Sequence, residues 1–342
     1  MEPEGDFLTA QAAQTPTSAD AREALTHPLI CRLLELGLPR LAGEVAKEHR
    51  VRRPDAASRL ENLDAGSRTP LAEINPPPLP QAFIALRQVA QNPMSTTTDV
   101  AGVIAMDPSL AAYVLRLANS ALYSFPARIE TVERAVSCIG LAEMETLALG
   151  AMVGKVFRNP PRADLLVMQD FWRHAVSVGL LSGALADCLG VDGRERFFTA
   201  GLLHDIGRLL LAIAEPDLAC MALDRAAATG KPLDAAEREV LDFDHAALGG
   251  RVCAKWQLPE SLIEAVTWHH DPGQCPDNAL VSVVHTADFM ANALGLRASP
   301  AAGLPVLDLT VLSALGLTEA DPPVLLDVLE SGLASLTAQF AV

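Results

Sequence analysis

Aromatic and basic residues are scarce in this sequence. Ten Phe, three Trp and two Tyr are the only aromatic residues among 342, although half of all residues are apolar. Leu and Ala supply much of that apolar half, which favours packed helices over a β-sandwich. With 26 Lys and Arg against 42 Asp and Glu, the formal net charge is −16. Because nucleic acids and anionic membranes are bound by positively charged surfaces, we expect neither as a partner.

Paired cysteines and targeting segments are also lacking. The six cysteines lie far apart and form no Cys-x-x-Cys pair, so we expect reduced thiols, with no disulfide framework or zinc knuckle. The N-terminus, MEPEGDFLTAQ, is acidic and has no signal-peptide pattern. We find no apolar run that approaches the ~20 residues needed to cross a bilayer. The sequence therefore predicts a cytoplasmic location.

Breaks in the helical pattern divide the chain into three parts. Residues 1–75 form an N-terminal segment in which helices are expected over 21–36 and 39–49, followed by a polar linker that ends in NPPPLP. This segment is either a docking segment or a flexible tail. Residues 76–296 carry helical signals with short breaks. Residues 297–342 are a leucine-rich helical extension that either completes the core or forms a homodimer contact.

The central part is predicted to be all-α, a multi-helical bundle of two lobes. Asn159-Pro160-Pro161 separates a first lobe, 76–160, from a second lobe, 161–296. In the first lobe, Asp107-Pro108 is typical of an N-cap followed by proline at the first helical position. No run of alternating polarity demands a sheet. Helices are expected near 131–156, 168–189, 195–214, 217–229, 233–256, 260–270 and 278–294.

Several histidines and aspartates of the second lobe occupy positions where the helical pattern predicts buried residues. His174 precedes Val178 by four residues in an apolar stripe, and Asp288 shares a row with Val284. The full set consists of His174, His204, Asp205, His245, His269, His270 and Asp288.

Each member of this set has a simpler explanation when it is taken alone. An inward histidine is more often a hydrogen-bonded core residue than a ligand. Asp205 could cap a helix and Asp288 could pair with an arginine, while His269-His270 could close a helix. Together, however, all seven would need separate buried partners, and buried carboxylates are rarely tolerated unless they are paired or bind metal. We therefore predict one shared polar site, with one or two divalent ions of iron, manganese or zinc as the candidate cofactor.

The seven residues follow the order H…HD…H…HH…D, which resembles the metal-ligand series of the HD phosphohydrolase superfamily, including its binuclear members. Longer phrases resemble those of the HDOD (HD-related output domain) family in sequential order, over about residues 76–296. These phrases are PPLP, DPSLAAYVLRLANSALYSF, AVSCIG, GLLHDIGRLLL, HAALGGRVCAKWQLPESLIEAVTWHHDP and HTADFMANALG.

The resemblance implies an output or regulatory protein of bacterial signal transduction. For most HDOD proteins no enzymatic activity is established and function is thought to run through protein contacts, so signalling proteins are the expected partners. No residue is assigned a catalytic role. The alternative is a metal-dependent phosphohydrolase that cleaves a phosphoester or cyclic nucleotide at a mono- or binuclear site. A third interpretation has a metal-free cluster that holds the helices in register, with function on the first lobe near Tyr113 or Arg116.

Two features depart from the cyclic di-GMP phosphodiesterase branch of the superfamily. The only tyrosines are Tyr113 and Tyr123, so no Gly-Tyr-Pro signature follows His269-His270. That branch usually has a lysine after HDIG, where this chain has Arg208. Arg208 either contacts a phosphate, which a guanidinium can bind bidentately, or pairs with an acid on the surface.

Overall fold

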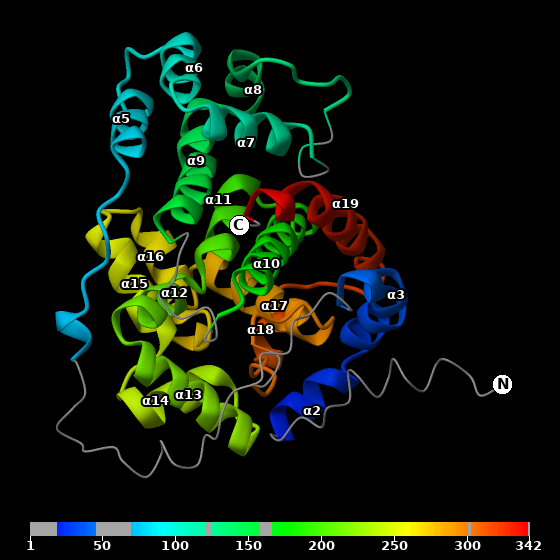
Figure 1. Ribbon diagram of the computed structural model, residues 1–342. Helices are drawn as coiled ribbons and strands as arrows, with labels where there is room; N and C mark the ends of the chain where they lie inside the picture. The colour runs from blue at the N-terminus through cyan, green and yellow to red at the C-terminus, as the bar shows by residue number, and fades with distance from the viewer. Residues whose placement is uncertain are drawn as a thin grey trace.

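The chain folds into helices. A computed structural model describes residues 19–45, 70–120, 123, 125–157, 166–299 and 302–340, and within these ranges no residue lies in a strand (Figure 1). The predicted all-α class is confirmed. The predicted break at Asn159-Pro160-Pro161 lies outside the described residues, as does most of the linker before Pro70. The six cysteines are free thiols, as expected.

The first group of helices occupies the top of Figure 1, where α9 runs down from it to contact α11. Asp107 caps α7, because its Oδ1 accepts hydrogen bonds from the backbone N–H groups of Ser109 (3.0 Å) and Leu110 (3.2 Å). The segment predicted over 131–156 is two helices, since Gly140 has a φ of 107° between them. The group comprises α5 (Gln81–Ala90), α6 (Thr97–Ala105), α7 (Pro108–Ala118), α8 (Val132–Ile139) and α9 (Leu141–Val156).

The second group is arranged around α10, which lies in the middle of Figure 1 and packs against α11, α17 and α19. Every residue of α10 from Asp170 to Ala186 is buried, so this helix is surrounded by others on all sides. The group comprises α10 (Met168–Cys188), α11 (Arg194–Leu203), α12 (Ile206–Ala214), α13 (Pro216–Thr229), α14 (Leu233–Leu241), α15 (His245–Lys255), α16 (Glu260–Trp268), the short η2 (Pro272–Gln274) and α17 (Ala279–Ala293).

Two helices predicted as continuous are each broken in the structure. The predicted helix over 195–214 is interrupted at His204 and Asp205, which form the turn between α11 and α12. The predicted helix over 233–256 ends at Leu241, because Asp242 takes a φ of 69°. Asp244 then caps α15, its carboxylate accepting from Ala247 N at 2.8 Å. Both breaks create helix ends inside the protein, where His204, Asp205 and His245 are buried.

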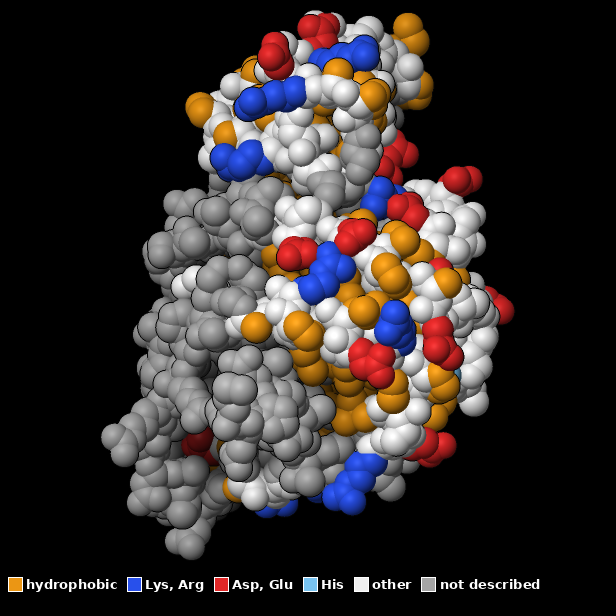
Figure 2. All heavy atoms as spheres, turned by 90° about the vertical axis from the view of Figure 1, so that its right-hand side faces the viewer, with side chains coloured by type: hydrophobic (Ala, Val, Ile, Leu, Met, Phe, Trp, Pro, Cys, Tyr) orange, Lys and Arg blue, Asp and Glu red, His pale blue; other side chains and the backbone are white. Residues whose placement is uncertain are grey.

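Helices from the two ends of the chain lie side by side. α3 packs against α19, and Arg40 of α3 pairs with Asp327 (2.7 Å) and Glu330 (2.6 Å) of α19. Leu329 and Leu333 of α19 are buried in the main apolar core, so the C-terminal extension contributes to that core. On this face, acidic and basic side chains are interspersed among apolar ones (Figure 2). The terminal helices are α2 (Ala19–Thr26), α3 (Pro28–Val45), α18 (Leu309–Ala314) and α19 (Pro322–Phe340).

The N-terminal helices differ from the predicted ones. The predicted helix over 21–36 is interrupted at His27, and α3 continues through Pro39, where a second helix had been expected to begin. Residues 46–49 of that second helix lie outside the described residues. The NPPPLP run after η1 (Leu71–Glu73) is non-helical, as predicted. It is held against α15 by Trp256, whose Nε1 donates to Pro77 O at 3.0 Å.

One described stretch, Arg194–Ala214, is long and apolar enough to cross a membrane by length and composition. The expectation that no apolar run approaches this length is wrong for this stretch. It comprises α11, the turn and α12, and 83% of its most apolar window is buried inside the protein. Its hydrophobicity is therefore accounted for by packing in the core.

Candidate metal centre

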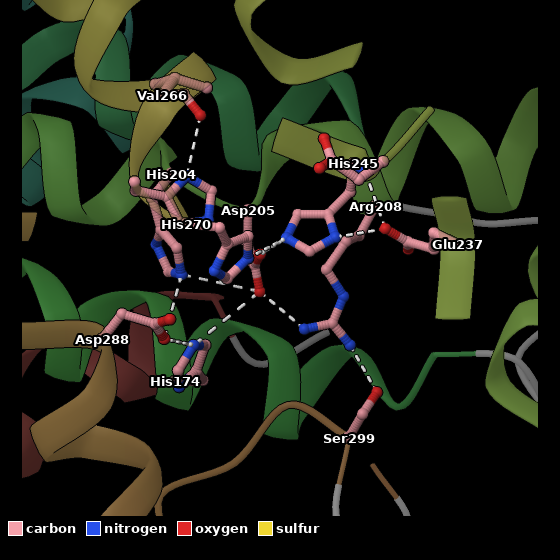
Figure 3. A network of polar contacts seen from close by, with 12 residues as sticks. His174, His204, Asp205, Arg208, Glu237, His245, Val266, His270, Asp288 and Ser299 are labelled. Carbon is pink, nitrogen blue, oxygen red and sulfur yellow. Dashed lines mark hydrogen bonds and ion pairs between the residues drawn. The ribbon is translucent and has the colours of Figure 1, made fainter. Parts of the chain in front are cut away.

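The seven predicted ligand residues meet at one place in the second group of helices. Figure 3 labels six of them, all except His269. Six of them are buried, and His270 is half-buried. Most lie at helix ends, where a side chain can turn into the interior without following the face of a helix. They come from α10 (His174), the α11–α12 turn (His204, Asp205), the start of α15 (His245), the end of α16 (His269, His270) and α17 (Asp288).

A glycine contact between α12 and α15 brings Asp205 to His245. A Cβ added at Gly207 would lie 1.9 Å from the carbonyl oxygen of His245 and 2.6 Å from the nitrogen of Gly249. Both are backbone atoms, so any larger residue would force the two helices apart. The sequence HDIG therefore ends one helix and lets the next begin in contact with α15, which places the Asp205 carboxylate among the histidines.

Asp205 faces two groups of imidazoles with its two oxygens. Oδ2 lies 3.8 Å from Nε2 of His174 and 3.7 Å from Nε2 of His204. Oδ1 lies 3.0 Å from Nε2 of His245, on the other side of the carboxylate. One carboxylate thus joins both halves of the cluster.

Asp288 completes the first half, and a pair of histidines forms the second. Oδ1 of Asp288 lies 3.2 Å from Nε2 of His174 and 3.6 Å from Nε2 of His204. In the second half, Nε2 of His270 lies 3.0 Å from Nε2 of His245, and His269 is the third imidazole there. The first half of the centre is defined as His174, His204, Asp205 and Asp288. The second half is defined as Asp205, His245, His269 and His270, so Asp205 belongs to both.

Main-chain carbonyls fix the tautomer of three of these histidines. A carbonyl oxygen can only accept a hydrogen bond, so the Nδ1 atom that faces it carries a proton. In the neutral ring, Nε2 then carries a lone pair. The Nε2 atoms of His204 and His269 are buried and have no hydrogen-bond partner among the described residues. The three contacts are His174 with Leu296 O at 2.7 Å, His204 with Gly201 O at 2.6 Å and His269 with Val266 O at 2.8 Å.

Neighbouring residues lower the pKa values of both aspartates in the cluster. Burial acts to raise the pKa of Asp205, but the positive charges of Arg208, His204 and His245 hold that pKa well below its usual range. Burial likewise opposes ionisation of Asp288, and the neighbouring His174 and His204 lower its pKa well below the ordinary value. Both aspartates are therefore carboxylates at neutral pH.

The histidines of the second half titrate in opposite directions. Burial lowers the pKa of His269 well below its ordinary value, and the neighbouring imidazoles lower it further. Burial also acts to lower the pKa of His245, but the carboxylates of Glu237 and Asp205 raise it well above the ordinary value. His269 is therefore neutral, with its lone pair directed into the cluster.

This donor set fits a divalent metal. Ionised carboxylates and imidazole lone pairs face one another, and such acceptors lie together stably only with a proton or a cation between them. Ligands about 2.1 Å from one ion lie roughly 3–4 Å from each other, which matches the spacings of the first half. Three groups have all their donor atoms within 4.8 Å of one another: His174, His204 and Asp205; His204, His269 and Asp288; and His245, His269 and His270. Nitrogen and carboxylate ligands suit iron, manganese and zinc.

Arg208 is not a surface residue. Its guanidinium is 9% exposed and donates from Nη1 to Asp205 Oδ2 at 2.6 Å and from Nη2 to Ser299 Oγ at 2.5 Å. One of the two alternatives for Arg208 was pairing with an acid on the surface. Arg208 does pair with an acid, but this acid is the buried Asp205, so the predicted surface location is wrong. A phosphate contact stays a prediction.

The cavity at the centre is small. It measures about 40 Å³ and is lined by residues of both halves together with Arg208, Asp234 and Ser299. A buried water needs about 10–15 Å³ measured in this way, so the cavity has room for a few waters or ions.

Several polar residues around the centre were not predicted. Glu237 accepts from Nδ1 of His245 at 2.5 Å, and Asn292 donates to Asp288 Oδ1 at 2.7 Å. His285 donates from Nδ1 to the carbonyl of His269 at 2.7 Å. The inward row of α17 includes His285 as well as Asp288, but nothing in the sequence pairs Glu237 with a residue eight positions away across a turn.

Comparisons with known proteins agree with this arrangement. An uncharacterised protein of Treponema pallidum is 25% identical over 216 residues, which is 62% of this chain and 41% of that protein. The chain therefore spans less than half the length of this curated relative. A structure from Shewanella amazonensis named as a candidate phosphohydrolase is 26% identical, with a TM-score of 0.60, over 83% of this chain and 98% of that chain.

A second structure shares the fold. A candidate signal transduction protein from Marinobacter aquaeolei is 21% identical, with a TM-score of 0.62, over 88% of this chain and 65% of that chain. The HDOD domain family matches residues 77–272, which is more than half of the chain. This range includes six of the seven predicted ligand residues, all except Asp288. The chain therefore belongs to the HDOD domain family.

Proposed function

We propose that this chain is an output protein of bacterial signal transduction whose His/Asp centre binds one or two divalent metal ions and which acts through contacts with other signalling proteins. The observation that carries the proposal is the convergence of metal-binding donors at one place. Carboxylates and imidazole lone pairs converge on a cavity of about 40 Å³, and Arg208 lies across it, bonded to Asp205 and Ser299. Such a centre has the donors and the room for one or two divalent ions.

The family supports the signalling part of this proposal. The solved relative from Marinobacter aquaeolei carries the name of a signal transduction protein. The net charge of −16 argues against nucleic acid or an anionic membrane as the partner, because both are polyanionic. We accordingly place the protein in the cytoplasm with protein partners, either other chains or a second copy of itself.

The second candidate function is a metal-dependent phosphohydrolase. The Shewanella amazonensis relative described above is named as a candidate phosphohydrolase, and a second solved structure from the same organism is named as a candidate metal-dependent phosphohydrolase. When bound, a divalent ion would lower the pKa of a coordinated water and polarise a phosphate. His174, His204, Asp205 and Asp288 would hold it, and Arg208 would contact the phosphate.

Elemental analysis tests metal binding, and a screen for turnover separates the two functions. The protein is purified without chelators or a nickel column, alongside a His204→Ala/Asp205→Ala variant whose folding is checked by circular dichroism. We expect one or two equivalents of iron, manganese or zinc in the wild type and loss of the metal in the variant. Phosphoesters and cyclic nucleotides are then screened with the loaded wild type. Absence of turnover supports the output function, whereas turnover abolished in the variant supports the hydrolase. A wild type that stays free of metal after reconstitution contradicts metal binding in both.

A further inference from the structure

Glu237 of α14 is a buried carboxylate outside the seven-residue cluster. It is 2% exposed, and its Oε2 accepts from the ring Nδ1 of His245 at 2.5 Å and from the backbone N–H of His245 at 2.8 Å. Arg208, Leu211 and Leu223 are among the residues that line a small cavity beside it. An ionised carboxylate in such surroundings is costly unless it is paired. His245 supplies that pairing.

The contact with Glu237 decides how the ring of His245 is turned. Because a carboxylate accepts at Nδ1, the proton lies on Nδ1, and Nε2 is directed at Asp205 Oδ1 and His270 Nε2, each 3.0 Å away (Figure 3). The backbone N–H contact by itself could be explained as support for the start of α15. That start is already capped by Asp244, however, and the ring contact is not needed for capping.

His245 differs in this from the other oriented histidines. His174, His204 and His269 donate to neutral main-chain carbonyls, whereas His245 donates to a charged group. A carboxylate behind a ligating imidazole makes Nε2 a stronger donor and holds the ring in place. We infer that Glu237 is a positioning residue for the second half of the centre, and that its negative charge decides whether this half retains a divalent ion. The inference rests on the proposed metal binding.

The charge of Glu237 can be removed without removing its shape. Glu237→Gln keeps an oxygen acceptor for both contacts of His245 and loses only the charge. Glu239→Gln is the matched control, because Glu239 lies on the same helix and pairs with Arg225 and Lys231 at the surface. Wild type and both variants are stripped with chelator and checked for equal unfolding midpoints. They are then titrated with zinc and with manganese, and bound metal is measured after dialysis.

We expect the wild type and Glu239→Gln to bind two ions. Glu237→Gln should retain the ion of the first half and bind the other about 10–100-fold more weakly. Cobalt substitution gives a second readout, because loss of the second half's ion removes one of two sets of visible absorption bands. A merely structural role of Glu237 would lower the unfolding midpoint without changing the ratio of the two affinities.

The outcomes separate this inference from the proposed function. Equal metal content and affinity in wild type and Glu237→Gln overturns the inference and leaves metal binding intact. A wild type that binds no metal overturns the proposed function, and the inference with it. In the metal-free protein, a low-field proton resonance from Nδ1 of His245 should shift to higher field in Glu237→Gln. If the wild type has no such resonance, the inference is overturned whatever the metal content.

Discussion

Arg208 Nη1 donates to Asp205 Oδ2 at 2.6 Å, and the same oxygen faces the imidazoles of the first half of the centre. The guanidinium is thus a positive charge built into the fold next to the carboxylate that joins both halves. In the absence of metal it balances the charge of Asp205. A bound metal would supply a further positive charge to the same carboxylate.

Removal of Arg208 should therefore destabilise the metal-free protein. In Arg208→Gln the buried Asp205 loses its closest positive partner, and breaking one side of a buried pair costs about 3–5 kcal/mol. Added zinc or manganese should restore part of this stability, because the ion supplies a positive charge to Asp205. Urea unfolding with chelator and with metal measures both effects. Arg225→Gln is the control, since its pair with Glu239 is 42% and 32% exposed and should contribute less than about 1 kcal/mol. Equal losses in the two variants would contradict this account.

Gly207→Ala should separate α12 from α15. The added methyl would lie 1.9 Å from His245 O, a backbone atom that cannot rotate away. Overpacking of this kind costs about 1–3 kcal/mol, and here it also moves Asp205 relative to His245. We expect a lower unfolding midpoint together with weaker metal binding.

Gly102→Ala is the matched control for this substitution. Gly102 lies on α6, and nothing lies within 4 Å of a Cβ added there. Alanine is favoured over glycine inside a helix by about 1 kcal/mol, so this variant should be slightly more stable and should bind metal normally. A Gly207→Ala protein as stable as Gly102→Ala would show that the helices do not meet as described.

His285 should make the stability of the metal-free protein depend on pH. Burial lowers the pKa of His285, which donates from Nδ1 to His269 O and accepts at Nε2 from Asp308 N at 2.9 Å. The folded protein thus keeps the ring neutral, whereas the unfolded chain protonates it below about pH 6.5. Stability is then fully present above that pH and is lost as the pH falls toward the folded pKa.

His285→Gln isolates this contribution, because glutamine does not titrate and still offers an acceptor to Asp308. The difference in unfolding free energy between wild type and variant, measured with chelator from pH 8 to pH 5, should decrease on acidification. The slope can reach about 1.4 kcal/mol per pH unit. A difference that stays constant with pH would mean that His285 is protonated to the same extent in both states.

The helical class and the inward positions of His174 and Asp288 follow from local pattern. His174 and Asp288 repeat at helical spacing with apolar neighbours, so their helices must turn them inward. The prediction of one continuous helix was wrong at His204-Asp205 and at Asp242. The apolar periodicity continues through both breaks, so the sequence pattern does not reveal them. The contact between Gly207 and His245 spans 38 positions and has no signature in either helix alone.

Sequence alone thus determined which residue types are available at the centre, and the period of 3.6 residues placed His174 and Asp288 on inward helix faces. Only the tertiary structure decided which oxygen of Asp205 faces which histidine, that Arg208 is buried against Asp205, and that Glu237 lies behind His245. These relationships depend on how helices cross and where their ends meet. Crossing geometry is set by the packing of whole helix surfaces, which the spacing of residues within one helix does not specify.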